Sequence, residues 1–196
     1  MPLSLSELGL LGGAYWWVVV VAAVFTLARF SEAFLILRAR SIGLPIMWAP
    51  VVMIVMNIVY AVSAYPAGVL SDKVNRVTLM IAGLVFLLLA DLCLALFSNI
   101  FGIVVGVALW GLHMGFTQSL LATLVADAAP AELRGTAFGV FNLVTGVALL
   151  LASLIAGALW DVSGPQATFL AGAFFAMLAF VGLLPLRRRL DGRKLA

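Results

Sequence analysis

The chain has 196 residues, of which 65% are hydrophobic and 10% are charged. A soluble domain carries about 45–50% apolar and about 25% charged residues, so this composition excludes a soluble fold and indicates a membrane protein. The net charge of +3 does not indicate nucleic-acid binding, because five of the eleven basic residues lie in the last ten positions, as in a cytoplasmic membrane anchor. We therefore expect a lipid bilayer, and no nucleic acid, as a partner.

The apolar residues fall into six segments that are each long enough to cross a bilayer, which takes about 20 residues. We predict membrane-spanning helices at residues 14–37, 46–70, 77–97, 100–126, 135–158 and 166–186. Short polar or Gly/Pro-rich breaks separate them, and the N-terminal stretch lacks the basic region of a signal peptide. The expected fold is one all-α integral membrane domain over residues 1–196.

Basic residues indicate which side of the membrane each loop faces. Six spans put both termini on one side, where eight basic residues lie: Lys73, Arg76, Arg134, Arg187, Arg188, Arg189, Arg193 and Lys194. The opposite loops hold only Arg38 and Arg40. Loops rich in Lys and Arg stay in the cytoplasm, so we expect both termini there and the chain in a bacterial cytoplasmic (inner) membrane.

A short repeat indicates internal symmetry. The pattern AGxLxD occurs at residues 67–72 and 156–161, after the second and the fifth predicted spans, so its two copies fall on opposite faces of the membrane. That geometry indicates an inverted repeat of three helices plus three. Chance agreement is the alternative, because Ala, Gly and Leu are abundant, and the shared aspartate is the informative match.

The break after the second span reads PAGVLSDKVNR, and its core residues are Gly68, Leu70, Asp72, Lys73 and Arg76. This stretch resembles the G-x-L-[SA]-D-[KR]-x-x-R signature of the major facilitator superfamily, which lies on the cytoplasmic link between the second and third helices of a six-helix half. The stretch PAELRGTAFGVFNLVTG resembles that family's link into the fifth helix, and the ending in RRR resembles the C-terminal half. The resemblance implies half of a major facilitator superfamily fold.

The resemblance also implies a gating motif. In this family the loop aspartate is thought to hold the N-terminus of a helix of the other half, where backbone N–H groups and the helix dipole stabilise an anion. Asp72 would take this role with Arg76 as its charge partner, and a solvated turn is the alternative. Family members have twelve helices and this chain has six, so a fragment, a split-gene product and a homodimer all remain open. In a homodimer, Asp72 would meet the region of Arg134 and Gly135 of the second chain.

Charged groups within the spans are further candidates, because a charge at the bilayer centre costs about 2.5–3.5 kcal/mol. Arg29 and Glu32 are three residues apart in the first span, on one face of a helix and close enough to pair. Substrate binding or proton coupling is one interpretation, and a structural pair near the outer interface is the other. Asp91 in the third span could take up a proton, but we favour a position near the outer surface.

Uncharged polar residues also lie within the spans. His113 is midway along the fourth span, with Trp110 and Thr117 on the same helical face. A role in binding a ligand or a proton is one interpretation, and a hydrogen-bonded packing histidine is favoured. Three further side chains must find partners there, either as cavity lining or as contacts between helices: Asn57, Gln118 and Asn142.

Several classes of chemistry are not expected. The chain has one cysteine and one histidine, which cannot form a disulfide or supply a zinc cluster. It contains neither the nucleotide-binding motif G-x-x-x-x-G-K-[ST] nor the nucleophile motif G-x-S-x-G. We expect no enzyme activity, no metal and no cofactor.

The leading hypothesis is a secondary carrier that moves a small solute, with protons as a candidate coupling ion, completed by a second six-helix half or by a homodimer. The alternative is a non-transporting membrane subunit, assembly factor or fragment that retains the half-fold.

Overall fold

The computed structural model describes residues 8–193, and among these every side chain except those of Ser119 and of residues 186–193. Lys194, which belongs to the predicted basic anchor, lies outside the described residues. Within the described range the chain is helical, in the order α2 (Gly13–Ala28), α3 (Ala33–Ser41), the 3-10 turn η1 (Ile46–Trp48), α4 (Ala49–Ser71), α5 (Arg76–Leu96), α6 (Ile100–Ala128), the 3-10 turn η2 (Ala131–Leu133), α7 (Arg134–Ser163) and α8 (Pro165–Arg193).

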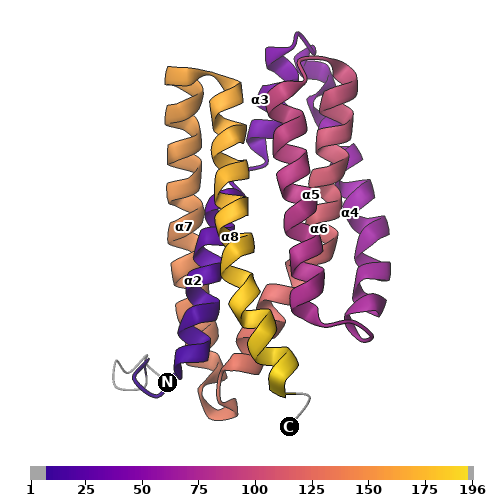
Figure 1. Cartoon of the computed structure of the whole chain (residues 1–196). Coiled ribbons are helices and arrows are strands. Elements are labelled where there is room, and N and C mark those ends of the chain that lie inside the picture. The colour runs from indigo at the N-terminus through magenta and orange to yellow at the C-terminus, as the bar shows by residue number, and fades with distance from the viewer. Residues whose placement is uncertain (1–7, 194–196) are drawn as a thin grey trace.

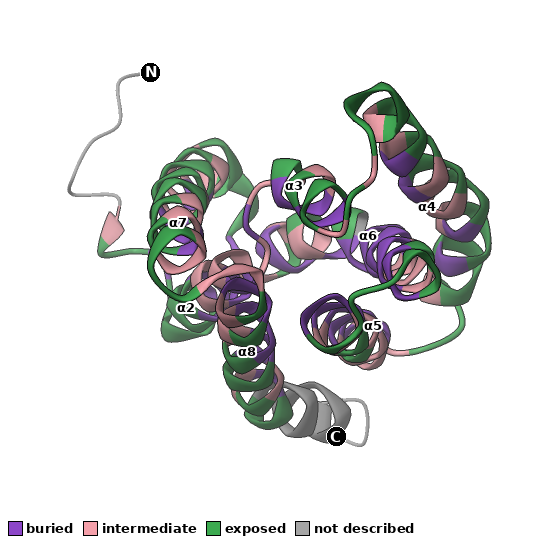
Figure 2. Cartoon of the chain, turned by 90° about the horizontal axis from the view of Figure 1, so that it is seen from above, coloured by how far each residue is buried: buried purple, intermediate pink, exposed green. Residues whose placement is uncertain are grey.

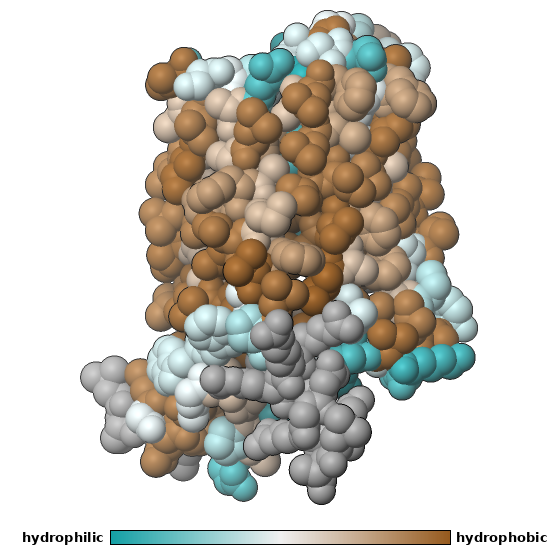
Figure 3. All heavy atoms as spheres, in the orientation of Figure 1, coloured by the Kyte–Doolittle hydropathy of each residue, from teal (hydrophilic) through white to brown (hydrophobic). Residues whose placement is uncertain are grey.

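Within residues 8–193, six stretches are long and apolar enough to cross a membrane, which confirms the six predicted spans. They run up and down between the two ends of the bundle, so the start of α2 and the last described turn of α8 lie at the same end (Figure 1). Apolar side chains cover the middle of the surface, and hydrophilic residues gather at both ends (Figure 3). This distribution is that of an integral membrane protein.

The first span is broken, so the prediction of one continuous helix over residues 14–37 is wrong. Helix α2 ends at Ala28, Arg29 takes a non-helical conformation with φ −110° and ψ 69°, and the chain becomes helical again at Ala33. Ser31 Oγ accepts a hydrogen bond from the N–H of Ala33 (3.4 Å), a local bond that competes with the helical pattern. The span is therefore interrupted within the bundle at residues 29–32, a break that begins with Arg29 and ends with Glu32.

The helices form an uneven bundle in which α5 and α6 lie at the centre. Helix α5 packs against α6 and α8, α4 packs against α6, and α2 packs against α7 and α8. Seen from above, α4 and α7 lie on opposite sides of the bundle and are mostly exposed (Figure 2). In their most apolar stretches only 17% of the residues of α4 and of α7 are buried, against 50% in α5 and 56% in α6.

Glycines on α6 allow its neighbours to approach closely. A Cβ atom on Gly111 would lie 2.5 Å from the backbone oxygen of Met56 on α4, and one on Gly115 would overlap Ser63. These are G-x-x-x-G positions, and here they serve packing within the chain. At Gly135, by contrast, an added Cβ would meet nothing within 4 Å.

Polar side chains cap the N-termini of α5 and α6. Asn75 accepts a hydrogen bond from the N–H of Val77 (2.9 Å), and Asn99 accepts one from the N–H of Gly102 (2.8 Å). Both are N-cap bonds that satisfy orphan amides. These caps place the short loops and fix where each helix enters the bundle.

Candidate functional site

A polar hollow lies between the break in the first span and helices α6 and α7. It consists of two adjoining cavities of about 520 Å³ and about 380 Å³, which share Arg29, Gly146 and Leu149. Pockets for small ligands have volumes of about 300–1,000 Å³. The hollow is therefore large enough for a small solute.

Side chains from α2, the break, α6 and α7 supply the polar lining of this hollow: Thr26, Arg29, Ser31, Glu32, Gln118, Asn142, Thr145 and Ser153. Thr26 and Thr145 donate their hydroxyl protons to carbonyls of their own helices, at 2.7 Å each, and so present oxygen acceptors to the hollow. The amides of Gln118 and Asn142 form no hydrogen bond with another described residue. The hollow thus offers a cation, an anion, donors and acceptors to a polar molecule.

Arg29 and Glu32 both line the hollow, but they do not pair as predicted. They lie in the break between α2 and α3, so they do not share the face of one helix. The two charges interact through space, yet the direct ion pair among the described residues joins Arg76 to Asp127. Both groups are half-buried and face the hollow.

Trp110 and His113 lie behind the hollow, in the core between α5 and α6. Both are 0% exposed. His113 Nδ1 lies 2.9 Å from the carbonyl oxygen of Gly83, its ring packs beside Phe25, and its Nε2 has no hydrogen-bond partner among the described residues. The structure thus separates these two side chains from the cavity lining.

Asn57 is also away from the hollow. It is exposed on α4, and its Nδ2 donates to the carbonyl of Met53 one turn earlier (2.8 Å). This bond within the helix satisfies one donor of the amide without any contact to another helix.

The loop between α4 and α5 holds the residues that resemble the family signature. Asp72 is exposed at the C-terminal end of α4, and Gly68, Leu70 and Lys73 are exposed beside it. The expected pairing of Arg76 with Asp72 is wrong, because Arg76 forms its ion pair with Asp127 at the end of α6.

The packing of the helices explains why Arg76 pairs with Asp127 and not with Asp72. Helix α5 lies alongside α6 over its whole length and touches α4 only slightly. Arg76, in the first turn of α5, therefore faces the end of α6. The Asp72 carboxylate is left on the surface of the bundle.

Four of the eight polar lining residues were not identified from the sequence: Thr26, Ser31, Thr145 and Ser153. A signal for two of them exists, because Thr26 precedes Arg29 by three residues and Thr145 follows Asn142 by three. That spacing puts polar groups on one side of a helix. Ser31 became a lining residue only because the helix breaks.

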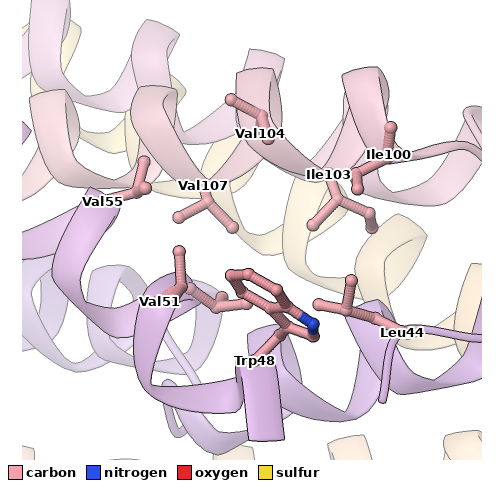
Figure 4. Close-up of a pocket in the computed structure, with 9 residues that line it drawn as sticks. Leu44, Trp48, Val51, Val55, Ile100, Ile103, Val104 and Val107 are labelled. Carbon is pink, nitrogen blue, oxygen red and sulfur yellow. The ribbon is translucent and has the colours of Figure 1, made fainter. Parts of the chain in front are cut away.

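A separate apolar cavity, of about 380 Å³, lies between the start of α4 and the start of α6 (Figure 4). Trp48 on the α4 side faces Ile103 and Val107 of α6, and the other lining residues are aliphatic. A polar solute would lose its hydration there without gaining hydrogen bonds. We therefore assign the polar hollow, and not this apolar cavity, as the candidate binding site.

A bundle of apolar helices that are long enough to cross a membrane, with a polar hollow between them, defines a multi-span membrane protein with a candidate binding site within its spans. Comparison with known proteins gives the family. Residues 35–196 match the Major Facilitator Superfamily, and the chain belongs to it.

Two relatives illustrate the match. The chain is 34% identical over 172 residues to an uncharacterised MFS-type transporter of Methanocaldococcus jannaschii, covering 85% of this chain and 43% of that protein. It is 27% identical over 124 residues to the glucose transporter GlcP of Staphylococcus epidermidis, covering 58% of this chain and 28% of that protein. The chain thus spans less than half the length of these relatives.

Proposed function

We propose that this chain is the C-terminal six-helix half of a secondary carrier, and that the polar hollow is its share of the path of a small solute. The observation that carries the proposal is the polar lining itself. Eight polar side chains from α2, the break, α6 and α7 converge on one hollow in a bundle whose core is mostly apolar. Polar groups inside a membrane protein typically mark such pathways.

The carrier would work by alternating access, with the hollow facing a second lobe across the membrane midplane. A second six-helix half or a second copy of this chain would supply that lobe. We place both termini in the cytoplasm on the distribution of Lys and Arg, and we assign the exposed Asp72 to a latch onto the other lobe.

A second candidate function is that of a non-transporting membrane subunit. The observation that favours it is the open side of the hollow, which one lobe alone does not close. Measurement of solute flux distinguishes the two functions.

The test is solute flux into lipid vesicles that hold the chain as purified from its natural membrane. Radiolabelled D-glucose is the first probe, because one relative is named as a glucose transporter. Small amino acids and carboxylates follow. We expect uptake of at least one solute class, and uptake of none would leave the non-transporting subunit as the function.

Asn142→Ala should lower the flux, because it removes an amide that faces the hollow. The loss of one hydrogen bond costs about 1 kcal/mol, which corresponds to roughly fivefold. Leu143→Ala is the matched control, since Leu143 is the next residue on α7, is 67% exposed and does not line the hollow. Equal flux in the two variants would contradict the assignment of the hollow.

A further inference from the structure

Asp91 is an acidic side chain in the middle of the helical core. It lies on α5, it is 0% exposed, and neither carboxyl oxygen has a hydrogen-bond partner among the described residues. Asp91 lies five residues before the last residue of α5, near that end of the span as expected, but packing within the bundle removes it from the surface. Helix α8 covers this face of α5 along its length, which removes Asp91 from solvent and from lipid alike.

Gly172 of α8 borders this carboxyl, and it also borders the ring of Phe30 in the break. The point where a Cβ on Gly172 would sit lies 2.7 Å from Asp91 Oδ2 and 3.0 Å from Phe30 Cε1. Glycine at position 172 therefore makes room for the acid and for the edge of the ring together. A larger residue there would displace one of them.

Among the described side chains of the elements packed against α5, no charged group neutralises Asp91. Helix α8 has no titratable residue between Pro165 and Pro185. On α6 the titratable group within the bundle is His113, which is bound to Gly83, eight residues or about 12 Å along α5 from Asp91.

The first span contributes three charged groups that could in principle reach this part of α5. Arg38 is occupied by the carbonyls at the end of α5, and Arg29 and Glu32 face the hollow. An unpaired carboxylate is costly in apolar surroundings, so the protonated acid is the form that this site favours.

Phe30 lies close to both this acid and the polar hollow. It lines the larger cavity beside Arg29 and Glu32, and it also lines, with Gly172, a small cavity of about 10 Å³ among α2, α7 and α8. Its ring packs against Trp110, with the centroids 5.5 Å apart. Because Phe30 lies in the non-helical break, a rotation there would move its ring without unfolding a helix.

We propose that Asp91 is a proton-binding site, closed from the polar hollow by Phe30, which exchanges its proton with water in the hollow when Phe30 moves aside at the break. The step is the dissociation of the carboxylic O–H bond, which leaves a carboxylate on Asp91 and transfers the proton to water. The coupling of this step to solute movement rests on the proposed transport function. The buried protonated acid does not depend on that function.

The first experiment is infrared difference spectroscopy of the chain in lipid vesicles at neutral pH. We expect the carbonyl stretching band of a protonated carboxylic acid, and its loss in Asp91→Asn. Asparagine has the size of the protonated acid, so a thermal melt should confirm that the variant keeps its fold. Asp161→Asn is the control, because Asp161 is exposed outside the core, and this variant should retain the band. A wild-type spectrum without the band, or a band that survives in Asp91→Asn, would overturn the proposal.

The second experiment measures how fast this acid exchanges its proton for deuterium after transfer to heavy water. Phe30→Ala should exchange severalfold faster than the wild type. Phe86→Ala removes a ring of the same size that packs against Phe116, and it should exchange at the wild-type rate. Equal rates in the two variants would refute the closing role of Phe30.

Solute flux separates this proposal from the proposed function. If the chain transports, a pH gradient should drive uptake in the wild type, and this dependence should be lost in Asp91→Asn while exchange of solute persists. Flux that is independent of the gradient in the wild type would refute the coupling. If no solute is transported while the acid band is present, the carrier function fails and the proton site stands.

Discussion

Arg38 is buried inside the bundle, 4% exposed, and its guanidinium closes the C-terminal end of α5. Its Nε donates to the carbonyl of Leu94 (2.7 Å), and its Nη2 donates to the carbonyl of Phe97 (3.2 Å). The last carbonyls of a helix have no partner within the helix. A cation there also interacts favourably with the helix dipole. One side chain thus joins the end of the first span to the end of the third.

Replacement of Arg38 by methionine should destabilise the fold, because it keeps most of the aliphatic volume and removes every donor. We expect a loss of about 2–3 kcal/mol, since hydrogen bonds to charged groups are stronger than neutral ones and the carbonyls would be left unpaired. The measurement is the thermal melting of the purified chain, followed by tryptophan fluorescence. Arg40→Met is the control, because Arg40 is exposed two residues away. Equal melting temperatures for the two variants would contradict this role.

The candidate site shows how far individual residues could be predicted. The sequence identified Arg29, Glu32, Gln118 and Asn142, because polar residues within an apolar span must face something other than lipid. The sequence did not distinguish these hollow-lining residues from His113, which is buried. Helical periodicity predicts which residues share a face of a helix, but it does not predict whether another helix packs against that face. In the structure, α5 packs against His113, whereas Asn142 faces the open hollow.

At the scale of the elements, the close contact of α4 and α6 depends on glycine. Gly111→Ala would push a methyl group into the backbone of α4 at Met56, and backbone cannot rotate away as a side chain can. We expect destabilisation of about 1–3 kcal/mol, the usual cost of overpacking, seen as a lower melting temperature in detergent. Gly135→Ala should be neutral or stabilising by roughly 0.5–1 kcal/mol, because it adds a methyl group in open space on a helix. A lower melting temperature for Gly135→Ala than for Gly111→Ala would show that the contact of α4 with α6 does not limit stability.

The elements themselves were predictable from hydropathy, and their interruption was not. Each predicted span has a helical counterpart, because about 20 apolar residues in a row have no other stable arrangement in a bilayer. The break at residues 29–32 escaped prediction because four residues do not change the average of a long apolar window. The polar pair Ser31 and Glu32, which follows Arg29 after Phe30, was its only local sign.

At the scale of the whole molecule, the hollow is open on one side. Gln118 and Asn142 are exposed there, and an amide that faces hydrocarbon without a partner costs about 2–7 kcal/mol, depending on the reference state. Helices α4 and α7 also bury few of their residues within the chain, and they lie at its two outer edges (Figure 2). Both features have one explanation if a second lobe covers the side on which the hollow opens.

We therefore expect native mass spectrometry of the assembly from its natural membrane to show two copies of this chain, or this chain with a second six-helix chain. Photoreactive probes on single cysteines locate the contact. Leu150 on α7 lines the hollow, and Phe174 on α8 does not, yet both side chains are 60% exposed. In a background that lacks Cys93, a probe at Leu150→Cys should capture protein, and a probe at Phe174→Cys should capture lipid. A single-chain mass, or capture of protein through Phe174→Cys alone, would contradict a partner over the hollow, because the polar lining would then have to be hydrated by water within one lobe.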